Sequence, residues 1–316
     1  MSSKVQPICN PNVGNFYRSP IFILAVGILA VSSASLFIRY AQREMPSIVI
    51  AAYRLGLASL IMTPWVWRKH NRQIVAIGRE NWIRIIVAGL LLAFHFASWI
   101  TSLEFTSVSS SVVLVTTTPI WVALFSPLIL KERSNRMTLI GLVVAIIGGV
   151  IVSMSNECVV SMEGMNCALH KSQSYPSGML GNGLALCGAI CAAFYLIIGR
   201  ILRKSIDLSV YVYCIFFSAA VFLVFFVIIS GISFYPYSIS TLLLCLALAV
   251  FPQIVGHTSL NWALGYLPVG LVAIVLLGEP VGSSILAALF LKEIPASLEL
   301  AGGIIILLGI FLASRK

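Results

Sequence analysis

Charged side chains are scarce in this chain. Asp, Glu, Lys and Arg make up 9% of its 316 residues, 59% are hydrophobic, and the mean hydropathy is +1.03. A soluble domain typically carries about 25% charged residues, so this balance excludes a soluble protein. The formal net charge of +10 does not indicate nucleic acid, because the basic residues lie in short segments between apolar runs, as in membrane proteins.

Signatures of several chemistries are missing too. The sequence has no Gly-rich phosphate loop, so ATP is not expected to drive this chain. The seven cysteines form no metal-ligand pattern, since Cys187 and Cys191 lie in an apolar run without His or acidic partners. A membrane enzyme would need clustered acid and base groups, and only one carboxylate and two histidines fall deep in apolar runs. We therefore predict no cofactor, no bound metal and no enzymatic activity.

Long apolar runs fill the chain instead. A run of about 20 residues crosses a bilayer as a helix, and backbone groups at membrane depth must satisfy one another, which favours helices over open strands. A β-barrel is excluded by continuous runs such as residues 304–308. We predict an all-α membrane protein with ten transmembrane helices. The predicted spans are 20–38, 46–66, 82–101, 106–130, 137–155, 178–199, 208–230, 239–262, 268–291 and 297–313.

The distribution of Lys and Arg predicts the orientation. With the N-terminus in the cytoplasm, 15 of the 20 basic residues lie inside and Arg54 lies within a span. The four outside are Arg39, Arg43, Lys171 and Lys292. Cytoplasmic loops are rich in Lys and Arg, so both termini are predicted to be cytoplasmic. Residues 1–19 lack the apolar core of a cleavable signal and are predicted to form a cytoplasmic tail.

A weak repeat relates the two halves of the chain. The stretch 119–148 recurs without gaps as 280–309, 161 residues later. The matches are Pro119 with Pro280, Lys131-Glu132 with Lys292-Glu293, Gly141 with Gly302, and Gly148 with Gly309. Each half has five spans, an odd number, so the second half enters the membrane from the opposite side. We predict two inverted five-helix repeats, 20–155 and 178–314, joined by an external loop at 156–177.

Several segments together resemble a known family. They are residues 95–103, 105–107, Pro119 and Lys131-Glu132, then 266–268, 278–281 and Lys292-Glu293, with Pro46 and Tyr53-Arg54 in the second span. Over about residues 20–314 the chain resembles the EamA-like branch of the drug/metabolite transporter superfamily. The resemblance implies ten helices, a central cavity lined mainly by spans 1, 3, 4, 6, 8 and 9, and alternating-access transport of small metabolites. The loop 156–177 is longer than is usual in that family.

Glu279 is the most informative single side chain. It lies near the middle of the ninth span, where a carboxylate costs at least about 2.5 kcal/mol, and it stands where the first half has Thr118. Glu279 is a candidate to bind a substrate amine or to take up a coupled proton. Alternatively, it serves the local backbone, because Pro280 removes a donor and frees the carbonyl of Leu276.

Other candidates are polar or aromatic side chains within the spans. The candidate substrate-binding residues are His95, Trp99, Thr117, Trp121, Tyr195, Gln253, His257, Asn261 and Glu279. His95 and Trp99 share one helical face, and Gln253, His257 and Asn261 form a polar stripe that must avoid lipid. In the 161-residue repeat, the positions of His95 and Trp99 correspond to Gly256 and Leu260 and not to the polar stripe. Either the halves line the cavity asymmetrically or one stripe is structural. Packing, helix–helix hydrogen bonds or an interfacial aromatic belt are the alternative roles.

The remaining features leave alternatives open. Arg54 is expected to snorkel outward or to pair with a neighbouring helix, and substrate binding is the less favoured alternative. The shared glycines allow close helix approach, within each half or at a dimer contact. Cys158 and Cys167 lie in the external loop and are predicted to form a disulfide if that compartment is oxidising. Pro119, Pro252 and Pro280 are predicted bending points.

The predicted function is secondary transport of small polar or amphipathic metabolites, amino acids or related amines, in the cell inner membrane, with a proton as a candidate coupling ion. Sugar phosphates would need converging basic residues, and Arg54 is the only basic residue that lies deep within a span. The alternative is multidrug or organic-cation efflux, and a membrane enzyme or channel is more remote. The predicted partners are lipid and a small-molecule substrate, not nucleic acid. Import or export, and monomer or homodimer, are left open.

Overall fold

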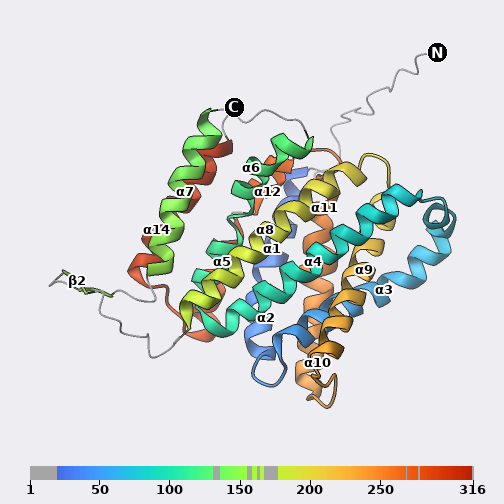
Figure 1. Cartoon of the computed structure of the whole chain (residues 1–316). Coiled ribbons are helices and arrows are strands. Elements are labelled where there is room, and N and C mark those ends of the chain that lie inside the picture. Colours follow the sequence, from blue (N-terminus) through green and yellow to red (C-terminus); the bar gives the residue numbers. More distant parts are fainter. Residues whose placement is uncertain are drawn as a thin grey trace.

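The computed structural model describes residues 20–130, 136–154, 159–161, 164–166, 177–267, 269–276 and 278–314. Within these residues the chain is a bundle of helices with one small hairpin (Figure 1). The antiparallel hairpin, β1 (Val159–Ser161) and β2 (Gly164–Asn166), lies in the segment predicted to be the long external loop. The predicted all-helical membrane architecture therefore holds for the bundle itself.

Each predicted span coincides with one helix or with consecutive helical pieces. In the first half these are α1 (Pro20–Ser32), α2 (Ala34–Ala41), α3 (Ser47–Val75), α4 (Arg79–Phe105), α5 (Val108–Val115), α6 (Thr118–Leu130) and α7 (Arg136–Met154). In the second half they are α8 (Gly178–Leu202), α9 (Leu208–Ile229), α10 (Ile239–Leu248), η2 (Ala249–His257), α11 (Thr258–Ala263), α12 (Val269–Val275), α13 (Gly278–Leu286), η3 (Ala287–Leu291) and α14 (Ser297–Ser314). Among the described residues, seven helices are long and apolar enough to cross a membrane, and three shorter apolar helices accompany them.

Several helix boundaries differ from the sequence prediction by three or more residues, and the largest difference is at the end of α3. Helix α3 continues to Val75, well past the predicted end at residue 66, and α4 begins at Arg79 rather than at residue 82. The added turns are polar and include good helix formers such as Arg68, Lys69 and Gln73. Hydropathy marks the membrane-crossing part of a helix, so it misses a polar extension of the same helix.

Prolines interrupt corresponding spans of the two halves. The chain turns at Thr116 and Thr117, between α5 and α6, just before Pro119. Pro119 has no N–H for the Val115 carbonyl, and the Thr118 hydroxyl donates to that carbonyl instead, at 2.9 Å. At the equivalent place in the second half, α12 ends at Val275 and α13 begins at Gly278, before Pro280. Sequence-equivalent prolines thus break the helix at equivalent points.

The third predicted bending point, Pro252, lies in the π-helical segment η2. A π turn widens the helix by one residue and is frequent at functional sites. Here it joins α10 to α11 and carries Gln253 and His257.

The shared glycines pack the last helices of the two halves together. Helix α14 lies along α7 (Figure 1). A Cβ at Gly148 would lie 2.7 Å from the carbonyl oxygen of Gly302, and one at Gly309 would lie 2.7 Å from that of Gly141. The glycines therefore pack one half against the other within a single chain, rather than within each half or across a dimer.

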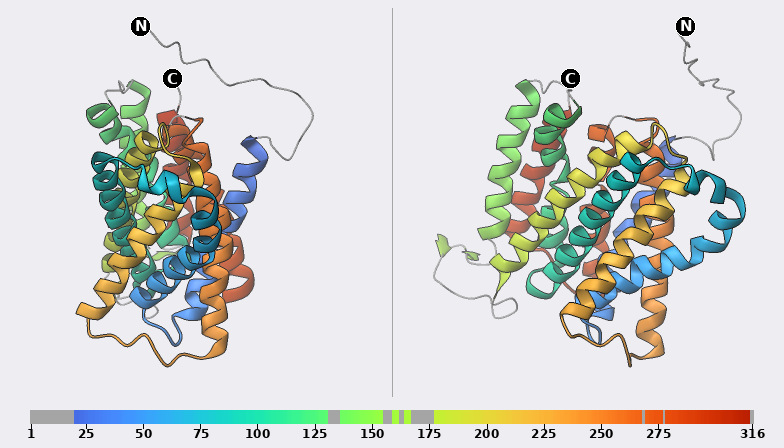
Figure 2. Two further views of the ribbon diagram at one scale, coloured as in Figure 1. Left: turned by 90° about the vertical axis from the view of Figure 1, so that its right-hand side faces the viewer. Right: turned by 45° about the vertical axis from the view of Figure 1, so that its right-hand side comes forward.

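Other helices of the two halves also interlock. Helix α4 packs against α8 and α9, α3 packs against α9, and α1 packs against η2 (Figure 2). The core of the protein is therefore shared between the halves, and its centre lies at their interface.

Some predictions fall outside the described residues. These are the tail 1–19, most of the loop 156–177 with Cys158 and Cys167, the pair Lys131-Glu132, and Pro268. They stay predictions.

Candidate functional site

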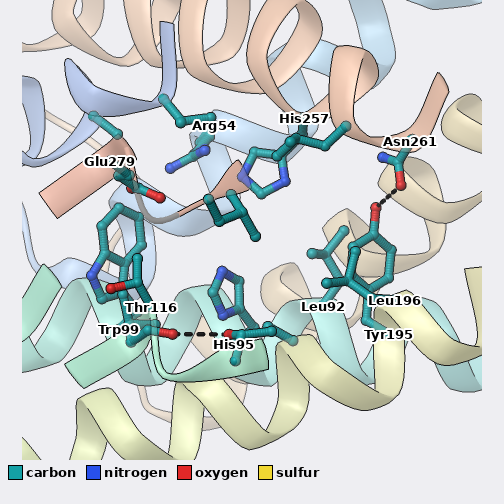
Figure 3. A pocket seen from close by; sticks show the side chains of 17 residues that line it. Arg54, Leu92, His95, Trp99, Thr116, Tyr195, Leu196, His257, Asn261 and Glu279 are labelled. Carbon is teal, nitrogen blue, oxygen red and sulfur yellow. Dashed lines mark hydrogen bonds between the residues drawn. The ribbon is translucent and has the colours of Figure 1, made fainter. Parts of the chain in front are cut away.

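A cavity lies where the two halves meet, and seven of the predicted spans contribute to its wall (Figure 3). It offers about 50 Å³ to the centres of water-sized molecules, several times the roughly 10–15 Å³ that one water needs. The cavity is therefore large enough for a few waters or a compact ligand. It is lined by Val31, Ala34, Arg54, Leu92, His95, Trp99, Val115, Thr116, Thr118, Ala192, Tyr195, Leu196, His257, Leu260, Asn261, Leu276 and Glu279.

Much of this lining obeys the internal repeat. Five pairs of lining residues are 161 positions apart, namely Val31 with Ala192, Ala34 with Tyr195, Trp99 with Leu260, Val115 with Leu276, and Thr118 with Glu279. Residues at equivalent positions in both halves thus face one shared space. In the polar groups the symmetry breaks, because Arg54, His95, His257 and Asn261 have the counterparts Ile215, Gly256, Phe96 and Ile100. Of the two alternatives raised by the sequence, the geometry matches asymmetric lining.

Glu279 enters the cavity from the first turn of α13. The residue is 8% exposed, and no hydrogen bond to its carboxyl group is found among the described residues. The carbonyl of Leu276, freed by Pro280, accepts instead from the backbone N–H of Glu279, at 3.0 Å. The local backbone is therefore satisfied without the carboxyl group, which leaves Glu279 available to the cavity.

Arg54 is a charged residue of the cavity that the sequence analysis did not name among the candidate substrate-binding residues. It is completely buried in α3, so it does not snorkel, and its Nε donates to Oε1 of Gln253 at 2.7 Å. Its Cζ lies 4.1 Å from the centre of the Phe96 ring and 5.9 Å from that of Trp99. Nη1 and Nη2 are buried without a hydrogen-bond partner in the described part of the chain. An ionisable residue inside a span is by default a functional candidate, and this rule could have identified Arg54 from the sequence.

Aromatic and imidazole rings face the cavity from more than one wall (Figure 3). The rings of His95 and Trp99 are nearly parallel, with centres 6.1 Å apart and a 13° interplanar angle, and His257 lies 6.5 Å from His95. Nδ1 of His95 lies 2.9 Å from the carbonyl oxygen of Gly188, to which it can only donate. This bond fixes the ring and leaves Nε2 on the other side.

A second-half pair completes the polar lining. The hydroxyl group of Tyr195 on α8 donates to Oδ1 of Asn261 on α11 at 2.6 Å (Figure 3). Nδ2 of Asn261 is buried and has no partner among the described residues, so it remains free to donate to a ligand.

Three predicted residues do not line this cavity. Thr117 donates to the carbonyl of Leu114 at 2.7 Å and accepts from Trp121 Nε1 at 3.2 Å, while the ring of Trp121 stacks on Phe125. The break at Thr116–Thr117 turns Thr117 away, and its neighbours Thr116 and Thr118 line the space instead. Gln253 accepts the hydrogen bond from Nε of Arg54 and is not among the residues that line the cavity. The cavity thus contains His95, Trp99, Tyr195, His257, Asn261 and Glu279 of the predicted set.

A polar network ties the halves together at one end of the bundle. Nη2 of Arg39 lies 3.3 Å from the Glu293 carboxylate and donates to the carbonyl of Thr106 at 3.3 Å. Glu293 also accepts from the N–H of Val108 at 2.6 Å. Close by in sequence, Ser107, the N-cap of α5, donates to Glu299 of α14 at 2.6 Å. Each of these contacts except that to Thr106 joins the first half to the second.

No group of three or more His, Cys, Asp or Glu residues that could hold a metal ion is found among the described residues. The cavity lining offers a guanidinium group, a carboxyl group, amide and imidazole groups, and aromatic faces.

Comparisons with known proteins agree with this two-part construction. The sequence profile of the EamA-like transporter family matches residues 18–154 and again 179–315, two segments that begin 161 residues apart. An "Uncharacterized transporter" of Archaeoglobus fulgidus is 25% identical over 304 residues, covering 93% of this chain and 96% of its own. The "Uncharacterized transporter YetK" of Bacillus subtilis is 22% identical over 298 residues, covering 93% and 86%.

A solved structure shares the fold. It is described as "Crystal structure of protein", and it superposes with a TM-score of 0.64 at 17% identity, covering 93% of this chain and 96% of that one.

Proposed function

The chain belongs to the EamA-like transporter family, and from this premise we propose that it is a secondary transporter of small amphipathic metabolites, amino acids or related amines. It is a multi-pass membrane protein, and we place it in the cell inner membrane with both termini cytoplasmic. This orientation rests on the excess of Lys and Arg on the side assigned to the cytoplasm.

The topology belongs to the same proposal. We assign ten membrane crossings to two inverted five-helix repeats, 20–155 and 178–314, joined by the external loop 156–177. Seven long apolar helices, three shorter ones and the 161-residue repeat support this assignment.

One observation carries the functional proposal. The central cavity is lined by five pairs of repeat-equivalent residues, so it lies between the two halves. In transporters built from inverted repeats, the substrate site lies at the repeat interface, and rocking of one half against the other exposes it alternately. A cavity in this position supports the role of substrate site.

The mechanism follows from the breaks in the helices. The turn at Thr116–Thr117, its counterpart before Pro280 and the π-helical η2 all border the cavity, and such interruptions are natural hinges. The network of Arg39 and Glu293 joins the halves on the side that we assign to the exterior, so it would open and re-form in each cycle. Glu279 is the candidate for proton coupling.

Organic-cation efflux is the second candidate, because a carboxylate beside aromatic faces also suits a cation. Flux measurements on purified protein in proteoliposomes test the transport proposal. We expect counterflow of radiolabelled amino acids or amines that is absent from liposomes without protein. A purified, folded protein that moves no member of a panel of amino acids, amines and organic cations would refute it.

A further inference from the structure

Arg54 has donors that the protein does not use. A guanidinium group carries five N–H donors, and in Arg54 the N–H of Nε binds Gln253. The four remaining N–H bonds belong to Nη1 and Nη2, which are buried and unpartnered among the described residues. A buried charge without a partner is costly, so an anionic group is the expected complement.

Glu279 faces Arg54 and interacts with it electrostatically, but it makes no direct hydrogen bond or ion pair with the guanidinium group among the described residues. The two ion pairs found among the described residues join Arg39 to Glu293 and Arg84 to Glu80. Arg54 and Glu279 instead line one end of the same cavity without bonding directly (Figure 3). The site therefore presents a cationic group and a carboxyl group to a single space.

The surroundings restrict the ligand further. The face of the guanidinium lies over the Phe96 ring, which leaves the Nη edge for a planar anion bound by two parallel hydrogen bonds, the geometry that a carboxylate offers. Leu92, Val115 and Leu260 supply apolar parts of the cavity wall. A ligand that matches all of these has a carboxylate, an ammonium group and a small apolar body.

We propose that the cavity binds its substrate as a dipolar ion, with the substrate carboxylate on Nη1 and Nη2 of Arg54 and its ammonium group on Glu279. The proposal rests on the transport function above and narrows it, because it excludes simple amines and organic cations as preferred substrates. The ligand class is that of α-amino acids with apolar side chains.

A ligand series on the unmodified protein tests this without any risk of misfolding. The probes are L-leucine and L-phenylalanine, their decarboxylated amines 3-methylbutylamine and 2-phenylethylamine, and their N-acetyl derivatives, compared by thermal shift and by competition in proteoliposome counterflow. A hydrogen-bonded charged contact corresponds to roughly a 10- to 100-fold change in affinity. We expect at least one of the two amino acids to bind, and to bind at least tenfold more tightly than its amine and its N-acetyl form.

Amines that bind as tightly as the amino acids would overturn the proposal, as would a lack of binding by both amino acids. If amines or organic cations are nevertheless transported, the transport function stands while the dipolar site fails. If nothing is transported, both fail.

Substitutions of Arg54 test whether this residue binds the substrate carboxylate. Arg54→Gln should bring the affinity ratio of amino acid to amine close to one, and Arg54→Lys should restore part of the preference. Arg72→Gln, an exposed arginine in the same helix α3, is the matched control and should keep the ratio unchanged. A folded Arg54→Gln protein with the wild-type ratio would contradict the assignment, and if neither Arg54 variant folds, the ligand series decides alone.

Discussion

At the scale of single residues, ligand binding in the cavity depends on which buried polar groups form hydrogen bonds within the protein and which remain available to a ligand. Gln253 is completely buried, and its Oε1 accepts a hydrogen bond from Nε of Arg54, so Gln253 orients the guanidinium group. Arg54 keeps its Nη groups free, and Glu279 keeps its carboxyl group free because the neighbouring backbone bonds itself. One residue thus positions a charge, and two others expose opposite charges to the same space.

Replacing Gln253 by Leu tests the positioning role. The change leaves every donor of Arg54 without a partner among the described residues, so we expect the free energy of unfolding to fall by about 1–3 kcal/mol, together with weaker substrate binding. Thermal unfolding in detergent measures the loss. The exposed Gln73→Leu at the end of the same helix as Arg54 serves as the control, and equal stability of the two variants would contradict this account.

Replacing Glu279 by Gln keeps the shape of the side chain and removes its charge. We expect amino-acid flux to fall roughly 10- to 100-fold, the value of a charged hydrogen bond, while the unfolding temperature changes little, because the carboxyl group supports no backbone group. Glu80→Gln, in an exposed pair with Arg84, should transport normally. Unchanged flux in a folded Glu279→Gln protein would rule out a role in substrate binding or coupling.

The sequence singled out most polar residues of the cavity because a polar side chain inside an apolar run avoids lipid and faces protein or a cavity. Arg54 escaped because a long basic side chain near a span end can snorkel, and only the neighbouring Phe96 and Gln253 show that it points inward. Thr117 and Thr118 could not be told apart, because the break before Pro119 decides which of them turns to the cavity.

At the scale of elements, two helices meet through glycines. The carbonyl oxygen of Gly302 lies where a Cβ on Gly148 would be placed, at 2.7 Å, so α7 and α14 approach more closely than any other residue type permits. The positions of the helices were predictable because the length of an apolar run indicates a membrane-crossing helix. The pairing of α7 with α14 was not predictable, since small residues can face any neighbouring helix.

Gly148→Ala should therefore destabilise the protein. Backbone atoms must move to admit the methyl group, and overpacking of this kind costs about 1–3 kcal/mol. Gly56→Ala in α3, where a Cβ would meet nothing within 4 Å, is the matched control and should not destabilise. Unfolding midpoints of the two variants measure the difference, and a Gly148→Ala protein as stable as the wild type would mean that the helices are not so close.

Another element contact gives a pH dependence. Glu44, in the turn between α2 and α3, accepts hydrogen bonds from the Ser238 hydroxyl at 2.5 Å and the Thr241 hydroxyl at 2.8 Å, at the start of α10. These bonds hold the pKa of the Glu44 carboxyl below its ordinary value of 4.5. The folded state favours the charged form, so the stabilisation is present above about pH 4.5 and is lost as the pH falls through the lowered pKa.

Glu44→Gln should consequently melt at a lower temperature than the wild type at pH 7, and the gap should close under acidic conditions. Melting curves of both proteins between pH 7 and pH 3 measure this gap. A gap that is constant with pH would show that the charge of Glu44 does not stabilise the contact.

At the scale of the whole molecule, two related halves enclose one cavity with unlike chemistry on its two sides. Equivalent positions build the wall, while Arg54, His95, His257, Asn261 and Glu279 give it polarity. The repeat could be found in the sequence from its prolines and glycines. The surface along which the two halves contact each other could not be found, because the packing of α4 against α8 and of α3 against α9 is not encoded in the repeat.

Access to the cavity from the two sides of the membrane tests the central claim most directly. Ala192, a lining residue of α8, is replaced by cysteine in a protein that has no other cysteine. Sealed vesicles that hold this protein in one orientation are then treated with a membrane-impermeant maleimide on either face. Alternating access predicts labelling from both faces, since the cavity opens to each side in turn. Labelling from one face only would contradict it, as would no labelling of a folded protein from either face.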